Sequence, residues 1–523
     1  MSTSYLSKFS ALVMILGLSG SSRAAQESAT EELSIDALVD EVWGNGGAAA
    51  PKDGGLELSL EAALSIGVAN DLGLQGASEF ADAARFRELG SWGAFDWIFS
   101  ASARVEDSRL DPSTDFEVGT GVVDIDTNSR DVTLGFQRAF MSGADLTIGV
   151  EHNNRSTNSL FARNGNKEVL SAAYTRPLLR GSGKDYATSL QEISGLRYQR
   201  EQESLRAQRQ QLLLDIELKY WDLVLAQRQL EVAGSALDLA LEQLQRDRRR
   251  REAGAGTDVE VIQGEATVAR RIEGVLAVET ALETRMDNLR SLLFPGVDEG
   301  AWSVQISPIT EMPPIAPAPG VELWEAEIQS ALAKRIEVKL AELDVEIATA
   351  LHERAVSEKR ASLDLLFQFG SQGFEDGLGA SLEEAFEFKS PSVAAGLNYQ
   401  LPMKNTALEN EEQAVRAELR GARIGLDRAR SLVAHEVREA LRQLRYQSEA
   451  SLAATKTREA AERLMLAERT RYEQGLATNF QVLEFQQALV EAQYAERAGL
   501  TAYCQALASL QAARGDAGSG SAQ

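Results

Sequence analysis

Two stretches of this chain, Arg250–Thr267 (RREAGAGTDVEVIQGEAT) and Arg471–Ala488 (RYEQGLATNFQVLEFQQA), are loose copies of one another. Matching residues lie 221 positions apart in three pairs, which are Gly254 with Gly475, Thr257 with Thr478, and Val261 with Val482. Each copy interrupts a long helical pattern, and glycine permits a tight reversal of the chain. The sequence therefore predicts two helical hairpins, one in each half of a duplicated chain.

The segments on either side of these turns are predicted to be unusually long helices. Apolar residues recur with helical spacing over 185–253 and 257–293 in the first half, and over 403–474 and 478–513 in the second. Since a helix rises about 1.5 Å per residue, a segment of nearly seventy residues would extend on the order of 100 Å. Spacing typical of coiled helices, alternating fours and threes, occurs at Val415, Leu419, Ala422, Leu426, Ala429 and Val433.

Between the helical segments the hydrophobic period changes to two, which predicts β-strands at about 94–177 and about 362–402. A transmembrane barrel strand needs about 9–11 residues, with one face apolar toward lipid and the other polar toward the lumen. The clearest of these strands have that length and alternation. A soluble sheet with one wet face would show the same alternation, so the strands alone leave both interpretations open.

The two halves differ in length within the strand region. Ala63 and Phe95 match Ala331 and Leu363 at an offset of 268, whereas Arg176 matches Leu401 at an offset of 225. The first half therefore carries 43 additional residues, the difference between these offsets. This is room for one extra hairpin, and the alternating pattern at Val132–Val150 fills it.

The N-terminus has the features of a secretory signal, with Lys8 before the apolar stretch Phe9–Leu18 and small residues before a cut after Ala24. No other segment approaches the ~20 apolar residues of a membrane-spanning helix. We therefore expect an exported protein that could span a membrane only with strands. The expected organisation is a signal peptide at 1–24, a flexible lead-in at 25–55, a first repeat at 56–294, a Pro-rich linker at 295–321, a second repeat at 322–513 and a disordered tail at 514–523.

Composition argues against several classes of function. The net charge of −25 is unfavourable for binding nucleic acid. Cys504 is the single cysteine, and the three histidines lie far apart in the sequence, so we expect no metal site. No catalytic motif is present either. The sequence predicts a protein that is not an enzyme and needs no cofactor.

Taken together, these features resemble the TolC-type outer membrane efflux family over residues 56–513. The resemblance is carried by the two halves, the YWDL run at Tyr220–Leu223, the RPLLRGSG run at Arg176–Gly183 and the twin turn motifs. It implies a mainly α-helical protein with a transmembrane β-barrel section, built from two helix–hairpin–long-helix repeats. It also implies a homotrimer in which the strands share one barrel and the helices form a periplasmic tunnel.

The resemblance also implies where function should lie. It places the pore and gate at the turns, with Glu260, Tyr472, Gln481 and Glu484 as the candidate residues. Gln481 is neutral, and Ala477 stands where the family can carry a basic linking residue, so this chain departs from a gate built on an arginine–acid pair. A hydrogen bond between Tyr472 and Glu260 stays open.

The turns themselves are candidate docking surfaces for a periplasmic adaptor, or membrane fusion protein. The residues concerned are Gly254, Gly256, Thr257, Gly475, Leu476 and Thr478. A purely structural turn would require the same glycines.

The resemblance further implies outer membrane lipid and an inner-membrane pump of RND or ABC type as partners. The function expected is a passive exit duct in a tripartite efflux or type I secretion system. The alternative is a non-transporting coiled-coil scaffold of the cell envelope.

Overall fold

The computed structural model describes residues 35, 39, 55–111, 115–121, 123–159, 161–296 and 299–516. The expected signal peptide, most of the lead-in and residues 517–523 lie outside this part of the chain. Two compact units are present, one containing Ala226–Glu283 with Met465–Val490 and the other Gly55–Leu225, Thr284–Leu464 and Glu491–Gln523. Four long helices contribute residues to both units: α6 (Ser189–Glu252), α7 (Asp258–Leu293), α12 (Thr406–Glu473) and α13 (Asn479–Arg514).

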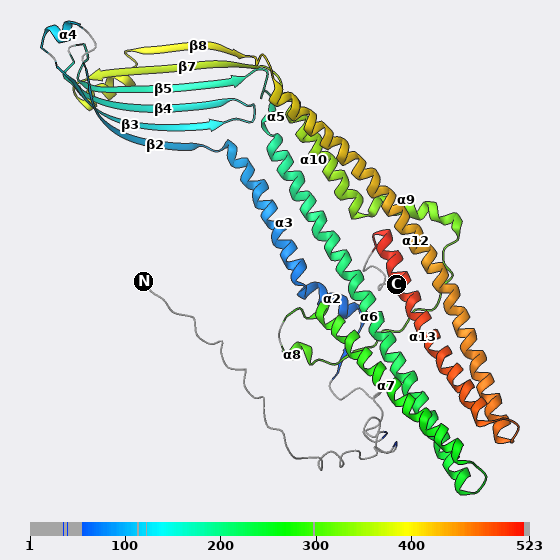
Figure 1. Ribbon diagram of the computed structural model, residues 1–523. Helices are drawn as coiled ribbons and strands as arrows, with labels where there is room; N and C mark the ends of the chain where they lie inside the picture. The colour runs from blue at the N-terminus through cyan, green and yellow to red at the C-terminus, as the bar shows by residue number, and fades with distance from the viewer. Residues whose placement is uncertain are drawn as a thin grey trace, which may run out of the picture. The chain divides into compact units, whose positions relative to one another are not determined.

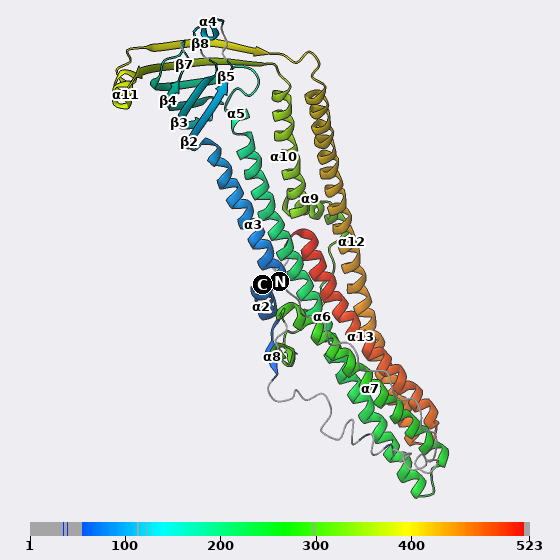
Figure 2. The same cartoon turned by 60° about the vertical axis from the view of Figure 1, so that its left-hand side comes forward.

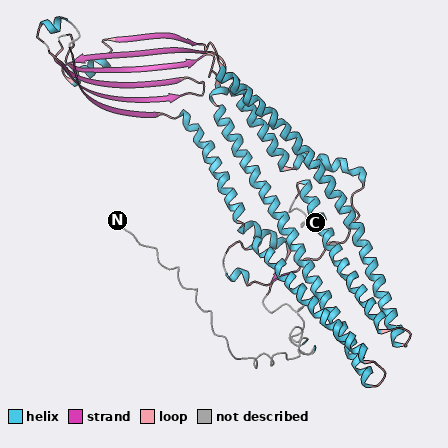
Figure 3. Ribbon diagram, in the orientation of Figure 1, coloured by secondary structure: helices cyan, strands magenta, loops and turns pink. Residues whose placement is uncertain are grey.

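The larger unit contains a six-stranded antiparallel sheet (Figures 1 and 3). In spatial order its strands are β2 (Ile98–Leu110), β3 (Ile125–Ala139), β4 (Asp145–Thr157), β5 (Gly165–Pro177), β7 (Ser362–Glu375) and β8 (Pro391–Gln400). Four strands come from the first half of the chain and two from the second. The pairing of β5 with β7 joins the halves into one sheet.

The extra hairpin predicted for the first half is β3–β4. It does not lie beside the sheet, because β3 pairs with β2 and β4 pairs with β5. The extra hairpin thus lies in the middle of the six-stranded sheet, and this sheet is antiparallel throughout.

The shorter helices of the larger unit are interrupted at two places. Before the first strand of the main sheet, the chain forms β1 and two helices, and Asp71 caps the second of these helices by accepting a hydrogen bond from the Leu74 amide at 2.6 Å. After the Pro-rich linker, two further helices are separated at Arg335, whose backbone is extended. The bounds are α2 (Leu60–Asn70), α3 (Leu72–Ser91), α4 (Asp115–Gly119), α5 (Lys184–Ala187), α8 (Glu299–Trp302), α9 (Trp324–Lys334), α10 (Ile336–Glu358) and α11 (Leu378–Phe386), with 3-10 helices at Trp92–Phe95 and Val321–Leu323.

The Pro-rich linker contains a strand that the sequence patterns did not indicate. β6 (Ile306–Pro308) pairs in parallel with β1 (Leu56–Leu58). Tyr220, fully buried, donates a hydrogen bond to the Leu58 carbonyl at 2.9 Å and accepts one from the Thr310 amide at 3.0 Å. The YWDL run therefore fastens this two-stranded sheet to α6.

The RPLLRGSG run continues the main sheet before the chain enters the helices. The Leu178 amide donates to the Leu363 carbonyl at 2.7 Å, and the Arg180 amide to the Ala361 carbonyl at 3.2 Å. These bonds extend the β5–β7 ladder beyond Pro177. The run therefore fixes the level at which strand gives way to helix.

The smaller unit contains the turn ends of both predicted helical hairpins, α6 with α7 and α12 with α13. Figure 2 shows the four helices. Val261 and Val482, one of the three matched pairs, are almost fully buried, as are Leu244 and Val268. Their burial explains why valine recurs in both copies of the motif. No helix in the described part of the chain is long and apolar enough to cross a membrane.

Candidate functional site

Both turns of the smaller unit have the same backbone geometry. Gly254 and Gly475 each have a φ of 74°, in the left-handed region that favours glycine. At the second turn, the Gly475 amide donates to the Tyr472 carbonyl at 2.9 Å and the Leu476 amide to the Arg471 carbonyl at 2.8 Å. The first turn repeats both bonds, so each helix ends in a Schellman motif. The two glycines are therefore explained by the turns alone.

The two turns differ two residues after their left-handed glycines. A Cβ added to Gly256 would lie 2.9 Å from the Arg251 backbone nitrogen, so the first turn has little room there. The second turn carries Ala477 at the corresponding position. Neither copy therefore provides a basic side chain at this point.

The helices that follow both turns begin with a capping box. Glu260 accepts a hydrogen bond from the Thr257 amide at 2.9 Å, and the Thr257 hydroxyl accepts one from the Glu260 amide at 3.3 Å. Gln481 and Thr478 make the same reciprocal pair at 2.9 and 3.4 Å. Since glutamate and glutamine both serve in this motif, the neutral Gln481 preserves it. The two residues predicted to line the pore thus first stabilise their helices.

Tyr472 links α12 to α6. Its ring lies 5.0 Å from the Arg250 guanidinium carbon, and the guanidinium also donates a hydrogen bond to the tyrosine hydroxyl. That hydroxyl donates to Asp247 at 3.4 Å. The bond between Tyr472 and Glu260 that the sequence left open is replaced by these partners, because Glu260 is held in its capping box.

Beneath Tyr472 lies a cluster of buried polar side chains formed by Gln243, Asp247 and Asn479. Gln243 donates to Asp247 at 2.9 Å and to the Asn479 side-chain carbonyl at 3.0 Å, and Asn479 donates to Asp247 at 3.2 Å. Burial raises the pKa of Asp247, against the opposing effect of its bonds from Asn479 and Gln243. Burial also raises the pKa of Tyr472, and the nearby Asp247 carboxylate adds to that effect.

We call these residues, together with Tyr472 and Arg250, the polar lock, because they connect α6 of the first hairpin to α12 and α13 of the second. The sequence patterns did not indicate Gln243, Asp247, Asn479 or Arg250. One signal was present, since Asp247 is the only acid within the arginine-rich run 246–251. An isolated acid among arginines on a largely apolar helix face indicates a specific partner.

The first hairpin is closed differently from the second. Arg251 on α6 pairs with Asp258 on α7 at 2.7 Å. The corresponding residues of the second copy are Tyr472 and Asn479, both of which contact Asp247 instead. The ion pair inside one hairpin has thus become a connection between hairpins in the other. Because of this divergence, Tyr472 and Asn479 of the second copy contact Asp247 of the polar lock, whereas Arg251 and Asp258 of the first copy pair with each other.

Glu484 is exposed in α13, one turn after Gln481. Among the described residues it makes no hydrogen bond or ion pair. Of the four candidate pore residues, Glu484 is therefore the one whose carboxylate makes no hydrogen bond or ion pair within the described part of the chain.

With the fold and turns described, the chain can be compared with solved structures. A membrane protein from Pseudomonas aeruginosa matches 90% of this chain and 98% of its own, with 18% identity and a TM-score of 0.65. The outer membrane protein VceC of Vibrio cholerae matches 88% of this chain and 96% of its own, with 15% identity and a TM-score of 0.64. The outer membrane channel CmeC of Campylobacter jejuni covers 87% and 85%, with 14% identity and a TM-score of 0.63.

The chain has the fold of these membrane proteins, which include an outer membrane channel. This confirms, at the level of the fold, the resemblance inferred from the two halves and the twin turns. No protein-family model and no curated protein matches the sequence.

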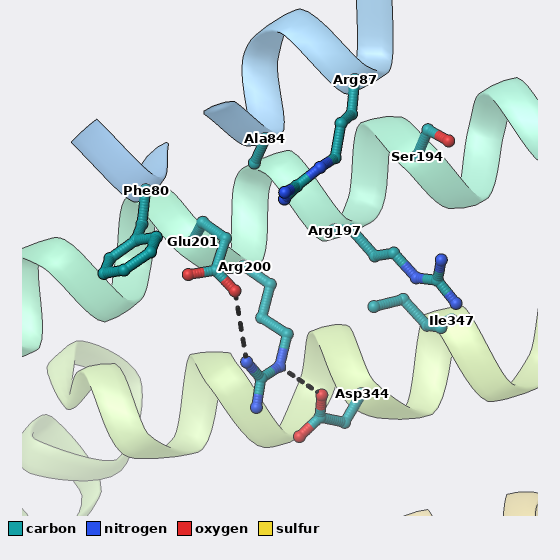
Figure 4. Close-up of a pocket in the computed structure, with 9 residues that line it drawn as sticks. All are labelled: Phe80, Ala84, Arg87, Ser194, Arg197, Arg200, Glu201, Asp344 and Ile347. Atoms are coloured by element: carbon teal, nitrogen blue, oxygen red, sulfur yellow. Dashed lines mark hydrogen bonds and ion pairs between the residues drawn. The ribbon is translucent and has the colours of Figure 1, made fainter. Parts of the chain in front are cut away.

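The larger unit also contains a pocket, shown in Figure 4. Arg200 lines this pocket and lies 2.6 Å from Asp344 and 3.8 Å from Glu201. The pocket is lined by Phe80, Ala84, Arg87, Ser194, Arg197, Arg200, Glu201, Asp344 and Ile347. The two acids engage Arg200, and the lining includes no nucleophile paired with a base. The turns therefore remain the principal candidate site.

Proposed function

We propose that this chain is the outer membrane channel of a tripartite efflux or type I secretion system. Three copies share a β-barrel in the outer membrane and a helical tunnel in the periplasm. The channel is passive, and a pump of RND or ABC type in the inner membrane supplies substrate through a periplasmic adaptor. The observation that carries the proposal is the match to outer membrane channels over nearly nine-tenths of the chain.

The sheet independently supports a membrane location. Large apolar side chains of one face are exposed, among them Phe99, Phe367 and Leu397. A continuous apolar surface of this kind is rare on soluble proteins and is the surface that barrel strands present to lipid. β2 and β8 are open edges of the sheet, and open edges do not occur in the hydrocarbon region. Pairing between the edge strands of neighbouring copies would leave no open edge in the membrane and would keep the apolar face toward lipid.

The polar lock supplies a candidate gate at the periplasmic end. It connects the two hairpins of one copy through hydrogen bonds to a buried carboxylate, Asp247. Separation of the hairpins would break these bonds and widen the opening between copies. Glu484, with its unengaged carboxylate, would contribute three negative charges around that opening in a trimer.

The turns provide a candidate surface for the adaptor. Leu476 and Phe480 at the second turn, and Val259 and Ile262 at the first, are each more than 60% exposed. The glycines are required by the turns, so these apolar side chains are the stronger candidates for adaptor contact. Adaptor binding here would act directly beside the polar lock.

Membrane fractionation of cells that express the protein tests the proposal. An outer membrane channel should be recovered with outer membrane lipid as a trimer that separates into monomers only on heating. Purified trimers should conduct ions in planar bilayers. Recovery as a soluble periplasmic rod without channel activity would favour the envelope scaffold instead.

Substrate class requires a second experiment. Deletion of the gene in cells with an intact pump should reduce export of either small toxic solutes or a secreted polypeptide. Loss of polypeptide export alone would assign the channel to type I secretion.

A further inference from the structure

The hairpin β3–β4, by which the first half exceeds the second, is a structural part of the main sheet. We propose that it belongs to the lipid-facing wall, so that three copies of the six-stranded sheet close a barrel of eighteen strands around a wide lumen. This inference rests on the proposed trimeric channel and adds the dimensions of its outer exit.

The first observation is a row of apolar side chains that crosses all six strands without interruption, here called the apolar row. Direct strand partners define it as Phe99, Phe136, Ile148, Ala172, Phe369 and Val393. The two hairpin members, Phe136 and Ile148, are 48% and 42% exposed, similar to the 44% of Phe369 on β7. A hairpin outside the membrane would have no need for an exposed apolar surface in register with the rest of the sheet.

The second observation concerns the adjacent residues, which point to the opposite face because side chains alternate along a strand. They form a second continuous row, here called the small row, consisting of Ser100, Gly135, Gly149, Ser171, Gly370 and Ser392. Every member is glycine or serine, and two come from the inserted hairpin. Apolar side chains outside and small ones inside are what a wide water-filled barrel requires at this level.

The direction of the edge strands permits the ring to close. Each strand is antiparallel to its neighbour from β2 to β8, and the number of strands is even. β8 of one copy would therefore lie antiparallel to β2 of the next when the copies are related by rotation. Insertion of a two-stranded hairpin preserves this relation, whereas a single added strand would have destroyed it.

The inserted hairpin has a large effect on the bore. Without β3–β4, three copies would supply twelve strands, and barrel diameter grows in rough proportion to strand number. Eighteen strands thus give a barrel about one and a half times as wide, with roughly twice the cross-section. At the level of the small row, no bulky side chain narrows this wider barrel. Selection among substrates would then occur at the periplasmic end.

Spin labels at matched positions test whether the hairpin faces lipid. The single native cysteine, Cys504, is buried, and burial raises the pKa of its thiol to about 12, so Cys504→Ala provides a suitable background. One label on each face is placed on β3 (Phe136→Cys, Gln137→Cys), β4 (Ile148→Cys, Thr147→Cys) and the reference strand β7 (Phe369→Cys, Gln368→Cys). Accessibility to oxygen and to a water-soluble nickel reagent is measured on trimers in lipid vesicles.

The expected result is oxygen access at positions 136, 148 and 369, and nickel access at 137, 147 and 368. Water access on both faces of β3 and β4, with normal alternation on β7, would overturn the inference and leave the proposed channel intact. Loss of alternation on β7 as well would instead contradict the membrane barrel itself, and with it the proposed function.

Electron cryomicroscopy of the same trimers provides a direct count. A barrel of eighteen strands with β8 of one copy bonded to β2 of the next is expected. A twelve-stranded wall with three hairpins outside it would refute the inference even if the labels gave an ambiguous pattern.

Discussion

At the scale of single residues, Gly475 allows the structural role of the turn to be tested separately from the proposed binding of an adaptor. Its φ of 74° belongs to the left-handed region, where a side chain is strained. Nothing lies within 4 Å of a Cβ built at this glycine, so backbone conformation is the whole constraint. A small substitution therefore measures the turn without altering the exposed surface beside it.

We expect Gly475→Ala to destabilise the second hairpin by about 1 kcal/mol, since left-handed backbone costs an L-residue about that amount. Denaturant unfolding monitored by hydrogen exchange at the turn would measure this. Gly421→Ala is the matched control, because Gly421 lies inside α12 with open space around its Cβ. The same change there should stabilise by up to 1 kcal/mol. Equal effects at both positions would contradict the strained turn.

Residues of the polar lock should control opening. Tyr472→Phe removes both the acceptor for Arg250 and the donor to Asp247. A net loss of about 1 kcal/mol per hydrogen bond shifts a closed–open equilibrium roughly fivefold. Single-channel conductance or open probability in bilayers should therefore rise for Tyr472→Phe, and further for Tyr472→Phe with Asp247→Ala.

Glu260→Gln is the control for this experiment, because Gln481 shows that glutamine serves in the same capping box. It should leave conductance close to that of the native channel. If Glu260→Gln opened the channel as much as Tyr472→Phe, the gate would depend on the acid at 260 rather than on the polar lock.

The raised pKa of Asp247 predicts a pH dependence of stability. The folded state disfavours the charged form of this buried carboxyl, so its pKa lies above the ordinary value of 3.8. As pH falls toward the raised pKa, the folded state takes up the proton before the unfolded state does. The contribution of Asp247 to stability is therefore largest in acid and is lost as pH rises through the folded pKa.

Comparison with Asp247→Asn isolates this contribution from the other carboxyl groups. The melting temperature of Asp247→Asn relative to the native protein should be highest at neutral pH and should decrease as pH falls. A difference that is independent of pH would show that Asp247 titrates normally.

At the scale of elements, the sequence predicted those features that depend on local order. The long helices, the two turns and strands in both predicted strand regions are all found. The capping boxes could also have been found, because Thr257-x-x-Glu260 and Thr478-x-x-Gln481 are written in the sequence. The helix break at Arg335 could not, since its guanidinium donates to carbonyl groups at the end of α13, 177 and 178 residues away.

The polar lock was equally inaccessible to local patterns. Gln243 and Asn479 are 236 positions apart, and each looks like an ordinary exposed polar residue of a helix. Burial of three polar side chains together is stable only because each bonds to the others. These hydrogen bonds depend on how α6 and α13 pack against each other. A short stretch of sequence holds no information about that packing.

The exposed apolar side chains at the second turn should be needed for adaptor binding. Leu476→Ser with Phe480→Ser leaves the turn glycine and the capping box intact. We expect trimers to form normally while substrate export falls at least tenfold, as expected when two central apolar contacts are lost. Export and adaptor crosslinking in cells measure this, and Glu473→Gln at the same exposed helix end is the control. Normal export by the double variant would exclude these side chains from docking.

At the scale of the whole molecule, the proposed trimer would bring three copies of Glu484 together. Three carboxylates around a narrow opening attract cations and repel anions. We expect Glu484→Lys to shift the reversal potential in a salt gradient toward anion selectivity, whereas Glu484→Gln should produce an intermediate value. An unchanged potential in both variants would place Glu484 away from the conduction path.

The pairing of β5 with β7 has a consequence for biogenesis. Its closest partners, Pro177 and Asp364, are separated by 187 positions in the chain. During synthesis and export, four strands with an apolar face and an unfilled edge must wait for the second half to arrive. Such an intermediate is prone to aggregation. We therefore expect the proposed export route to depend on a holding chaperone, and a chain truncated before residue 362 to be degraded rather than assembled.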